Sequence, residues 1–229
     1  MLYNPGILGA FMLFIEKYIP QLSAMYSEPH RDYHSLTHIH GLHRIILSGS
    51  WQGLLQKKSD VTSANTHAIS RKLSFIAWFH DCYYDPYLGS PKNEQMSADI
   101  FQAMVLPDAT YSGASTFMDS VYEGIMLTSR HLSQLDVGYH DFEHLLFMDL
   151  DMLGFAYKDE FLRNNVSVRN EYYKTSDVEY LTNRLKFLKA LLAKDKIYYL
   201  LSDELEASAR ANISESIETD SRTLDILAR

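Results

Sequence analysis

Histidines are concentrated in one short stretch of this sequence. Five of the ten histidines fall within fourteen residues, namely His30, His34, His38, His40 and His43. His34 and His38 are four residues apart, so in a helix their side chains project from neighbouring turns of one face and could serve one site. Taken alone, the cluster could also consist of hydrogen-bonded surface histidines.

A second pair of chemical groups follows the apolar stretch LSFIAWF. His80 and Asp81 come directly after it, at the expected end of a helix that faces the core. Polar groups at such a place need partners, because burying them unpaired is costly. A divalent metal is one such partner, since an imidazole and a carboxylate together form a mixed nitrogen and oxygen site.

Two more carboxylates interrupt the apolar run FEHLLFMDLDMLGF. Burying Asp149 and Asp151 there costs folding free energy unless the carboxylates have partners or a function. Helical phase places Asp149 with Leu145, Leu146 and Leu153, and Asp151 on the opposite side. Phase alone therefore favours Asp149 as the carboxylate that faces a site.

The remaining sequence predicts one all-α domain over residues 1–229. The chain is 46% hydrophobic and 22% charged, which is ordinary globular usage. Ser176 and Glu179 form a capping-box pattern at one helix start. Apolar residues recur at helical spacing, approximately over 7–22, 36–56, 69–80, 93–105, 116–128, 141–155, 158–173, 179–192 and 203–217.

Charge and cysteine content restrict the partners and the compartment. The formal net charge of −8 has the wrong sign for binding duplex nucleic acid. A single cysteine, Cys82, excludes an internal disulfide and favours a reducing, cytoplasmic compartment. The apolar run 7–15 is too short to span a bilayer, and no Lys or Arg precedes it as in a secretory signal, so no membrane association is expected.

His38, the His80-Asp81 pair and an aspartate about seventy residues later resemble the H…HD…D signature of the HD superfamily of metal-dependent phosphohydrolases. The resemblance to an uncharacterised bacterial group of that superfamily extends over about 26–199, through YSEPHRDYHSLTHI, AWFHDCYYDP, MDLDMLG and VRNEYY. It implies an all-α helical bundle with a metal site in its core, on which N- and C-terminal helices pack.

The resemblance also implies a ligand set. The metal would be held by His38, His80, Asp81 and Asp151. Asp151 is chosen over Asp149 because it has a leucine two residues later, as the family pattern favours. Asp149 remains the alternative from helical phase. His131 lies where some HD proteins place a ligand for a second metal.

Catalytic roles follow from the same resemblance. YHSLTHI is similar to the YHNxxHA motif of cyclic-nucleotide phosphodiesterases, which makes His34 the proton donor. Ser35 departs from that motif, and the purine-clamping glutamine pattern is missing, so cyclic nucleotides are not implied. Asp81 would act at the metal. Glu94, thirteen residues beyond Asp81, is a candidate from its position to hold or deprotonate the attacking water or to orient a metal-bound histidine, and capping of a helix N-terminus is the alternative.

The basic residues nearest these motifs are candidates for binding a phosphate group, namely Arg31, Lys92, Arg130 and Arg169. Cys82 follows the His-Asp pair, but no pattern that would activate a nucleophilic thiol surrounds it, so packing is its expected role.

These patterns together predict a phosphohydrolase with one or two divalent metal ions (Mn, Mg, Fe, Co, Ni or Zn). Its substrate would be a nucleotide or another small phosphorylated metabolite. A di-iron oxygenase, which would draw extra ligands from His34, Glu94 and His131, is one alternative. A non-enzymatic nucleotide-binding sensor is another. The sequence leaves the oligomeric state open.

Overall fold

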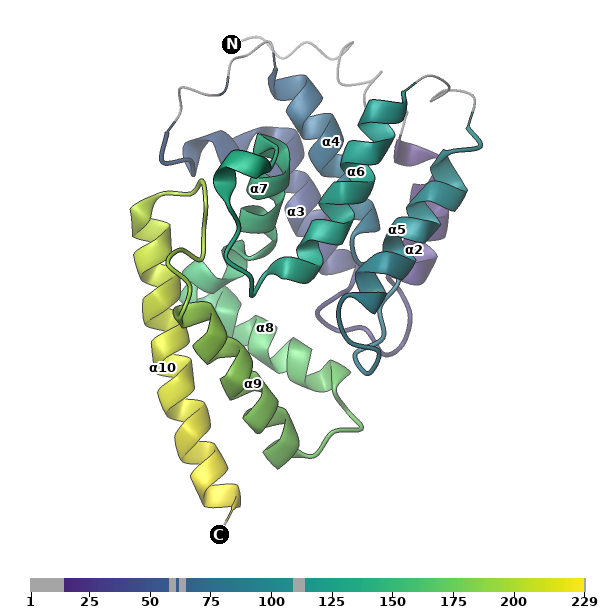
Figure 1. Ribbon diagram of the computed structural model, residues 1–229. Coiled ribbons are helices and arrows are strands. Elements are labelled where there is room, and N and C mark those ends of the chain that lie inside the picture. The colour runs from purple at the N-terminus through teal and green to yellow at the C-terminus, as the bar shows by residue number, and fades with distance from the viewer. Residues whose placement is uncertain (1–14, 58–60, 62–64, 109–113, 229) are drawn as a thin grey trace. The chain divides into compact units, whose positions relative to one another are not determined.

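The computed structural model describes residues 15–57, 61, 65–108 and 114–228 (Figure 1). Within these ranges the chain forms α-helices and short 3-10 turns and no strand, so the all-α prediction is confirmed. The helices are α2 Ile19–Met25, α3 Leu36–Ser48, α4 Thr66–Phe79, α5 Lys92–Val105, α6 Ser115–Leu127, α7 Phe142–Asp151, α8 Lys158–Glu171, α9 Asp177–Leu192 and α10 Asp203–Leu227.

Two helix ends differ most from the prediction. The pattern over 36–56 predicted one long helix, but α3 ends at Ser48 because Gly49 adopts a left-handed conformation with φ 68°. The 3-10 turn Ser50–Gly53 follows it. At the other end of the chain, α10 continues to Leu227, ten residues beyond the predicted limit at 217. Residues 7–14, half of the predicted helix over 7–22, lie outside the described residues.

The contacts divide the chain into two compact units, and the prediction of a single domain stays a prediction. The first unit comprises residues 1–50 and 61–129. Its centre is α4, which contacts α2, α3, α5 and α6. The whole C-terminal half of α4 is buried, because Leu73, Phe75, Ile76, Trp78 and Phe79 cover nearly its entire circumference.

The second unit comprises residues 51–60 and 130–229. The long helix α10 lies beside α9, and α8 and the 3-10 turn Leu153–Ala156 also contact it (Figure 1). The helix α9 begins as predicted, since the Ser176 hydroxyl accepts a hydrogen bond from the Glu179 amide. None of the described helices combines the length and the apolar character that crossing a bilayer requires.

Candidate metal centre

The His-Asp pair lies where α4 ends. His80 is 1% exposed, and its Nδ1 is 3.0 Å from the carbonyl oxygen of Ala77. A carbonyl only accepts hydrogen bonds, so the ring proton sits on Nδ1. The other nitrogen, Nε2, lies 3.0 Å from Oδ2 of Asp81. A ring fixed in this way by a backbone carbonyl is typical of histidines that bind metals.

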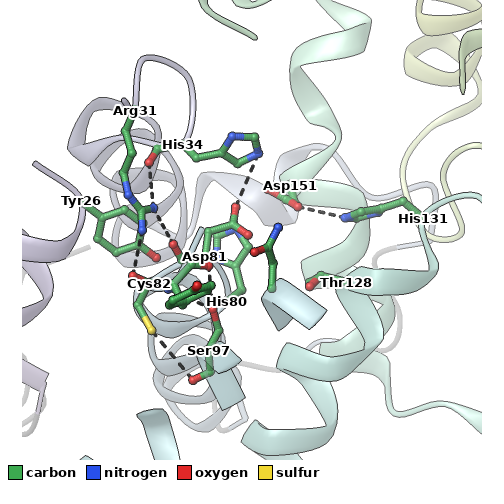
Figure 2. Close-up of polar contacts among 12 residues, drawn as sticks. Tyr26, Arg31, His34, His80, Asp81, Cys82, Ser97, Thr128, His131 and Asp151 are labelled. Carbon is green, nitrogen blue, oxygen red and sulfur yellow. Dashed lines mark hydrogen bonds and ion pairs between the residues drawn. The ribbon is translucent and has the colours of Figure 1, made fainter. Parts of the chain in front are cut away.

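The first unit brings three predicted site residues together around Asp81. His38, from α3, has its ring centroid 6.0 Å from that of His80. His34 precedes α3, and its Nε2 lies 3.9 Å from Oδ2 of Asp81 (Figure 2). The His34 ring also stacks on Tyr84 at 3.9 Å between centroids. Both His34 and His38 thus lie near the C-terminal end of α4, although His34 precedes the helix α3 and is separated from it by the extended residue Ser35.

The other two histidines of α3 have a different environment. The rings of His40 and His43 each contact the Trp78 ring edge-on, at 5.7 Å between centroids. Burial, together with the charge of His40, lowers the pKa of His43 from 6.5 to about 4. Four of the five clustered histidines therefore form two pairs, one beside the His80-Asp81 dyad and one beside Trp78. The fifth, His30, has its Nε2 2.9 Å from the Tyr84 carbonyl oxygen.

The geometry does not support the phosphate-binding role predicted for Arg31. Its side chain is fully buried, and its guanidinium donates hydrogen bonds to Glu28 and to the carbonyl oxygens of His34, Asp81 and Cys82 (Figure 2). Each of its three nitrogens donates inside the protein. Arg31 is a structural cross-link in the candidate site.

Helix α5 fixes the segment that follows Asp81, a role that the sequence reasoning did not assign. The side chain of Asn93 accepts a hydrogen bond from the Asp85 amide and donates one to the Asp85 carbonyl, at 3.0 and 2.9 Å. The Ser97 hydroxyl accepts from the Tyr83 amide and donates to its carbonyl, at 3.1 and 3.2 Å. Their positions at i and i+4 were the available signal, because such residues share one helix face.

Two of the predicted site residues lie at the start of α5. Lys92 is exposed at the first position of the helix. Glu94 is in the first turn, where the helix dipole favours a carboxylate. Its Oε2 is buried and has no hydrogen-bond partner among the described residues. A buried carboxylate oxygen in this condition can accept a hydrogen bond from water or a ligand.

Cys82 has the packing role that the sequence indicated. Its thiol is 2% exposed and lies 3.8 Å from the Ser97 carbonyl oxygen. Burial raises the pKa of this thiol to about 12, so a reactive thiolate does not form near neutral pH.

The second unit holds both candidate aspartates, and it uses them differently. Asp149 is completely buried, and its carboxylate accepts hydrogen bonds from the backbone amides of Tyr199, Leu200 and Leu201 at 2.8, 2.7 and 3.2 Å. Burial raises the pKa of Asp149 to about 7, against the opposite effect of these three bonds. Both of its oxygens are thus engaged with the backbone.

Asp151 instead faces a histidine. Its Oδ2 lies 3.0 Å from Nε2 of His131, and the two side chains are 13% and 19% exposed (Figure 2). Lys194 donates a hydrogen bond to the His131 carbonyl, and the Tyr199 hydroxyl bonds both Ser133 and Leu135. The loop that carries His131 is therefore held to the segment before α10.

That segment is itself fixed by two carboxylates. The Glu206 carboxylate accepts hydrogen bonds from the amides of Ile197 and Tyr198, and Asp149 takes the next three amides. Five successive amides of residues 197–201 are bonded to side chains in a segment without helix or extended strand.

The two predicted phosphate-binding residues of the second unit differ in whether their side chains are free to contact a substrate. Arg169 pairs with Asp177 and donates to the carbonyls of Tyr172 and Thr175, so it joins the end of α8 to the start of α9. This geometry does not support a substrate role for Arg169. Arg130 is exposed and directly precedes His131, so its guanidinium is available to a substrate.

Comparisons with models of known families, with curated proteins and with solved structures found no match to this chain.

Proposed function

We propose that this protein is a metal-dependent phosphohydrolase that acts on a small phosphorylated molecule. The observation that carries the proposal is the arrangement of His80 and Asp81. The Nδ1 proton of His80 is bonded to the Ala77 carbonyl, which leaves Nε2 directed at a carboxylate oxygen 3.0 Å away. Two acceptor atoms at this distance require a proton or a metal cation between them.

The donor set suits a divalent metal. In the first unit, His38 and His80 each offer one ligand atom, and Asp81 adds a carboxylate. Imidazole and carboxylate ligands together suit Mn, Fe, Co, Ni or Zn. We assign the closing ligand to Asp151 rather than Asp149, because the Asp149 oxygens are engaged with three backbone amides. A bound metal would lower the pKa of a water molecule and neutralise charge on a phosphate oxygen.

The residues around the donor set supply the remaining chemistry. His34 is 20% exposed and lies beside Asp81, so it can donate a proton to the leaving oxygen. The buried Oε2 of Glu94 can accept a proton or a hydrogen bond from the attacking water. Lys92 and Arg130 remain as the cations for the substrate phosphate, since Arg31 and Arg169 are engaged elsewhere. We propose a nucleotide as the substrate, and His131 as a ligand for a second metal.

The test combines metal analysis with a panel of phosphoesters. The protein would be loaded with Mn, Mg, Fe, Co, Ni or Zn in turn, and phosphate release would be measured from nucleotides, cyclic nucleotides and sugar phosphates. We expect turnover in wild type, loss of turnover and of bound metal in His80→Ala and Asp81→Ala, and neither loss in His40→Gln. His40 is the matched control, because it belongs to the same cluster but lies beside Trp78.

Other results would contradict the proposal in specific ways. Stoichiometric iron with oxygen consumption and no phosphate release would indicate an oxygenase. Tight nucleotide binding without turnover in any metal would indicate a sensor. An unchanged metal content in His80→Ala would refute the ligand assignment itself.

A further inference from the structure

Arg31 is the most completely buried cation beside the candidate site. Its side chain is 0% exposed. A guanidinium cannot be deprotonated, so it tolerates burial only when its N–H groups find acceptors. Four hydrogen bonds, at 2.9, 3.1, 2.7 and 2.9 Å, meet this requirement.

The acceptors of Arg31 belong to two parts of the chain that are fifty residues apart. Nη1 donates to the carbonyl oxygens of both His34 and Asp81, and Nη2 donates to that of Cys82. One nitrogen thus joins the backbone of the proposed acid to that of the proposed ligand. The carbonyls of Asp81 and Cys82 follow the end of α4, where the helix dipole favours a positive charge.

Aromatic rings complete the cage around Arg31. The guanidinium carbon lies 5.2 Å from the Tyr26 ring centroid and 5.8 Å from that of Tyr84. The Tyr84 ring also stacks on His34. Arg31 therefore holds His34 in two ways, directly through its carbonyl and indirectly through the ring on which it stacks.

We propose that Arg31 is a positioning residue that sets the distance between His34 and Asp81, and so aims His34 at the leaving oxygen. This inference rests on the proposed phosphohydrolase function. This role is specific to arginine, because a lysine ammonium at the same place cannot span three carbonyl oxygens in a fixed geometry as the planar guanidinium does.

The first experiment uses leaving groups that differ in their need for an acid. A p-nitrophenolate ion departs without a proton, whereas an alkoxide needs one. We expect Arg31→Lys to lower kcat on an alkyl phosphate by up to about 100-fold, because small displacements of catalytic groups cost about that much. kcat on p-nitrophenyl phosphate should change little. Equal losses on both esters would overturn the positioning role, and Arg44→Lys is the matched control on α3.

A second measurement does not depend on turnover. Diethyl pyrocarbonate would be used to modify histidines, and the rate at His34 would be read by mass spectrometry. We expect His34 to react severalfold faster in Arg31→Lys than in wild type, because its stacking on Tyr84 is loosened. Glu28→Gln removes the carboxylate that pairs with Arg31 and lies 3.9 Å from His30, and it leaves the carbonyl bonds of Arg31 in place. This variant should show a smaller increase, and it replaces Arg31→Lys if that variant does not fold.

The two measurements separate the two proposals. An inactive wild type would refute the proposed function, and the His34 modification rate would still decide the role of Arg31. An unchanged rate at His34 in folded Arg31→Lys, or in Glu28→Gln if only that variant folds, would overturn the positioning role whatever the activity.

Discussion

The contact of His40 and His43 with Trp78 leads us to predict that the stability of the protein depends on pH through the titration of His43. Burial and the neighbouring charge of His40 lower the pKa of His43 from 6.5 to about 4. The unfolded chain therefore binds a proton at His43 before the native protein does. The stabilising effect is present above pH 6.5 and is lost as the pH falls from there to about 4.

The magnitude follows from the two pKa values. The difference between 6.5 and about 4, at 1.36 kcal/mol for each tenfold change in acidity, corresponds to at most about 3 kcal/mol. His43→Phe should abolish this part of the pH dependence, because phenylalanine can keep the edge-on contact with Trp78 and does not titrate. It also removes Nε2, a buried atom without a hydrogen-bond partner among the described residues.

The assay is urea-induced unfolding, followed by tryptophan fluorescence at about pH 7.5 and about pH 4.5. Between these conditions, wild type should lose about 2 kcal/mol more stability than His43→Phe. His40→Gln should show an intermediate value, since the His40 charge is the smaller of the two causes. Equal losses in wild type and His43→Phe would refute the reasoning.

The other predictions concern residues whose roles the structure separates. Asp149→Ala leaves three backbone amides unpaired, two of them buried, and should lower the free energy of unfolding by about 3 kcal/mol. Asp151→Ala should instead lose bound metal, with a smaller effect on urea unfolding. The reverse pattern would exchange their assignments. Cys82 should resist a thiol reagent in the native protein and react only in denaturant, and fast native labelling would contradict its burial. Arg169→Ala should lower stability by roughly 1–2 kcal/mol with an unchanged KM, while Arg130→Ala should raise KM roughly tenfold; a raised KM in Arg169→Ala would restore its substrate role.

The helices were predictable wherever local signals agreed. The α9 pattern combined a capping residue with apolar spacing, and its observed start, Asp177, lies two residues before the predicted one. The end of α3 was missed because its apolar spacing continues past Gly49. Only the left-handed backbone at that glycine shows that the helix stops there.

The candidate site was predictable where the residues are close in sequence. His38 lies on α3 and the dyad His80-Asp81 follows α4, and these two helices are in contact. Helical spacing does not explain the position of His34, because His34 precedes α3 and Ser35 between them is extended. The bonds of Arg31 to backbone carbonyls could not be predicted, because the sequence around a cation near a motif is the same whether the cation faces a ligand or the backbone. Helical phase correctly placed Asp149 inside the protein, but Asp149 contacts backbone amides that are distant in the sequence.

The segment 197–201 has no regular secondary structure, and yet we expect its backbone amides to exchange slowly with solvent. Its five successive amides donate to Asp149 and Glu206 rather than to a helix or sheet. In native-state hydrogen exchange, these amides should exchange as slowly as those of a helix interior and should lose their protection together. A coil before α10 would then open only with the core of its unit, unlike an ordinary surface loop.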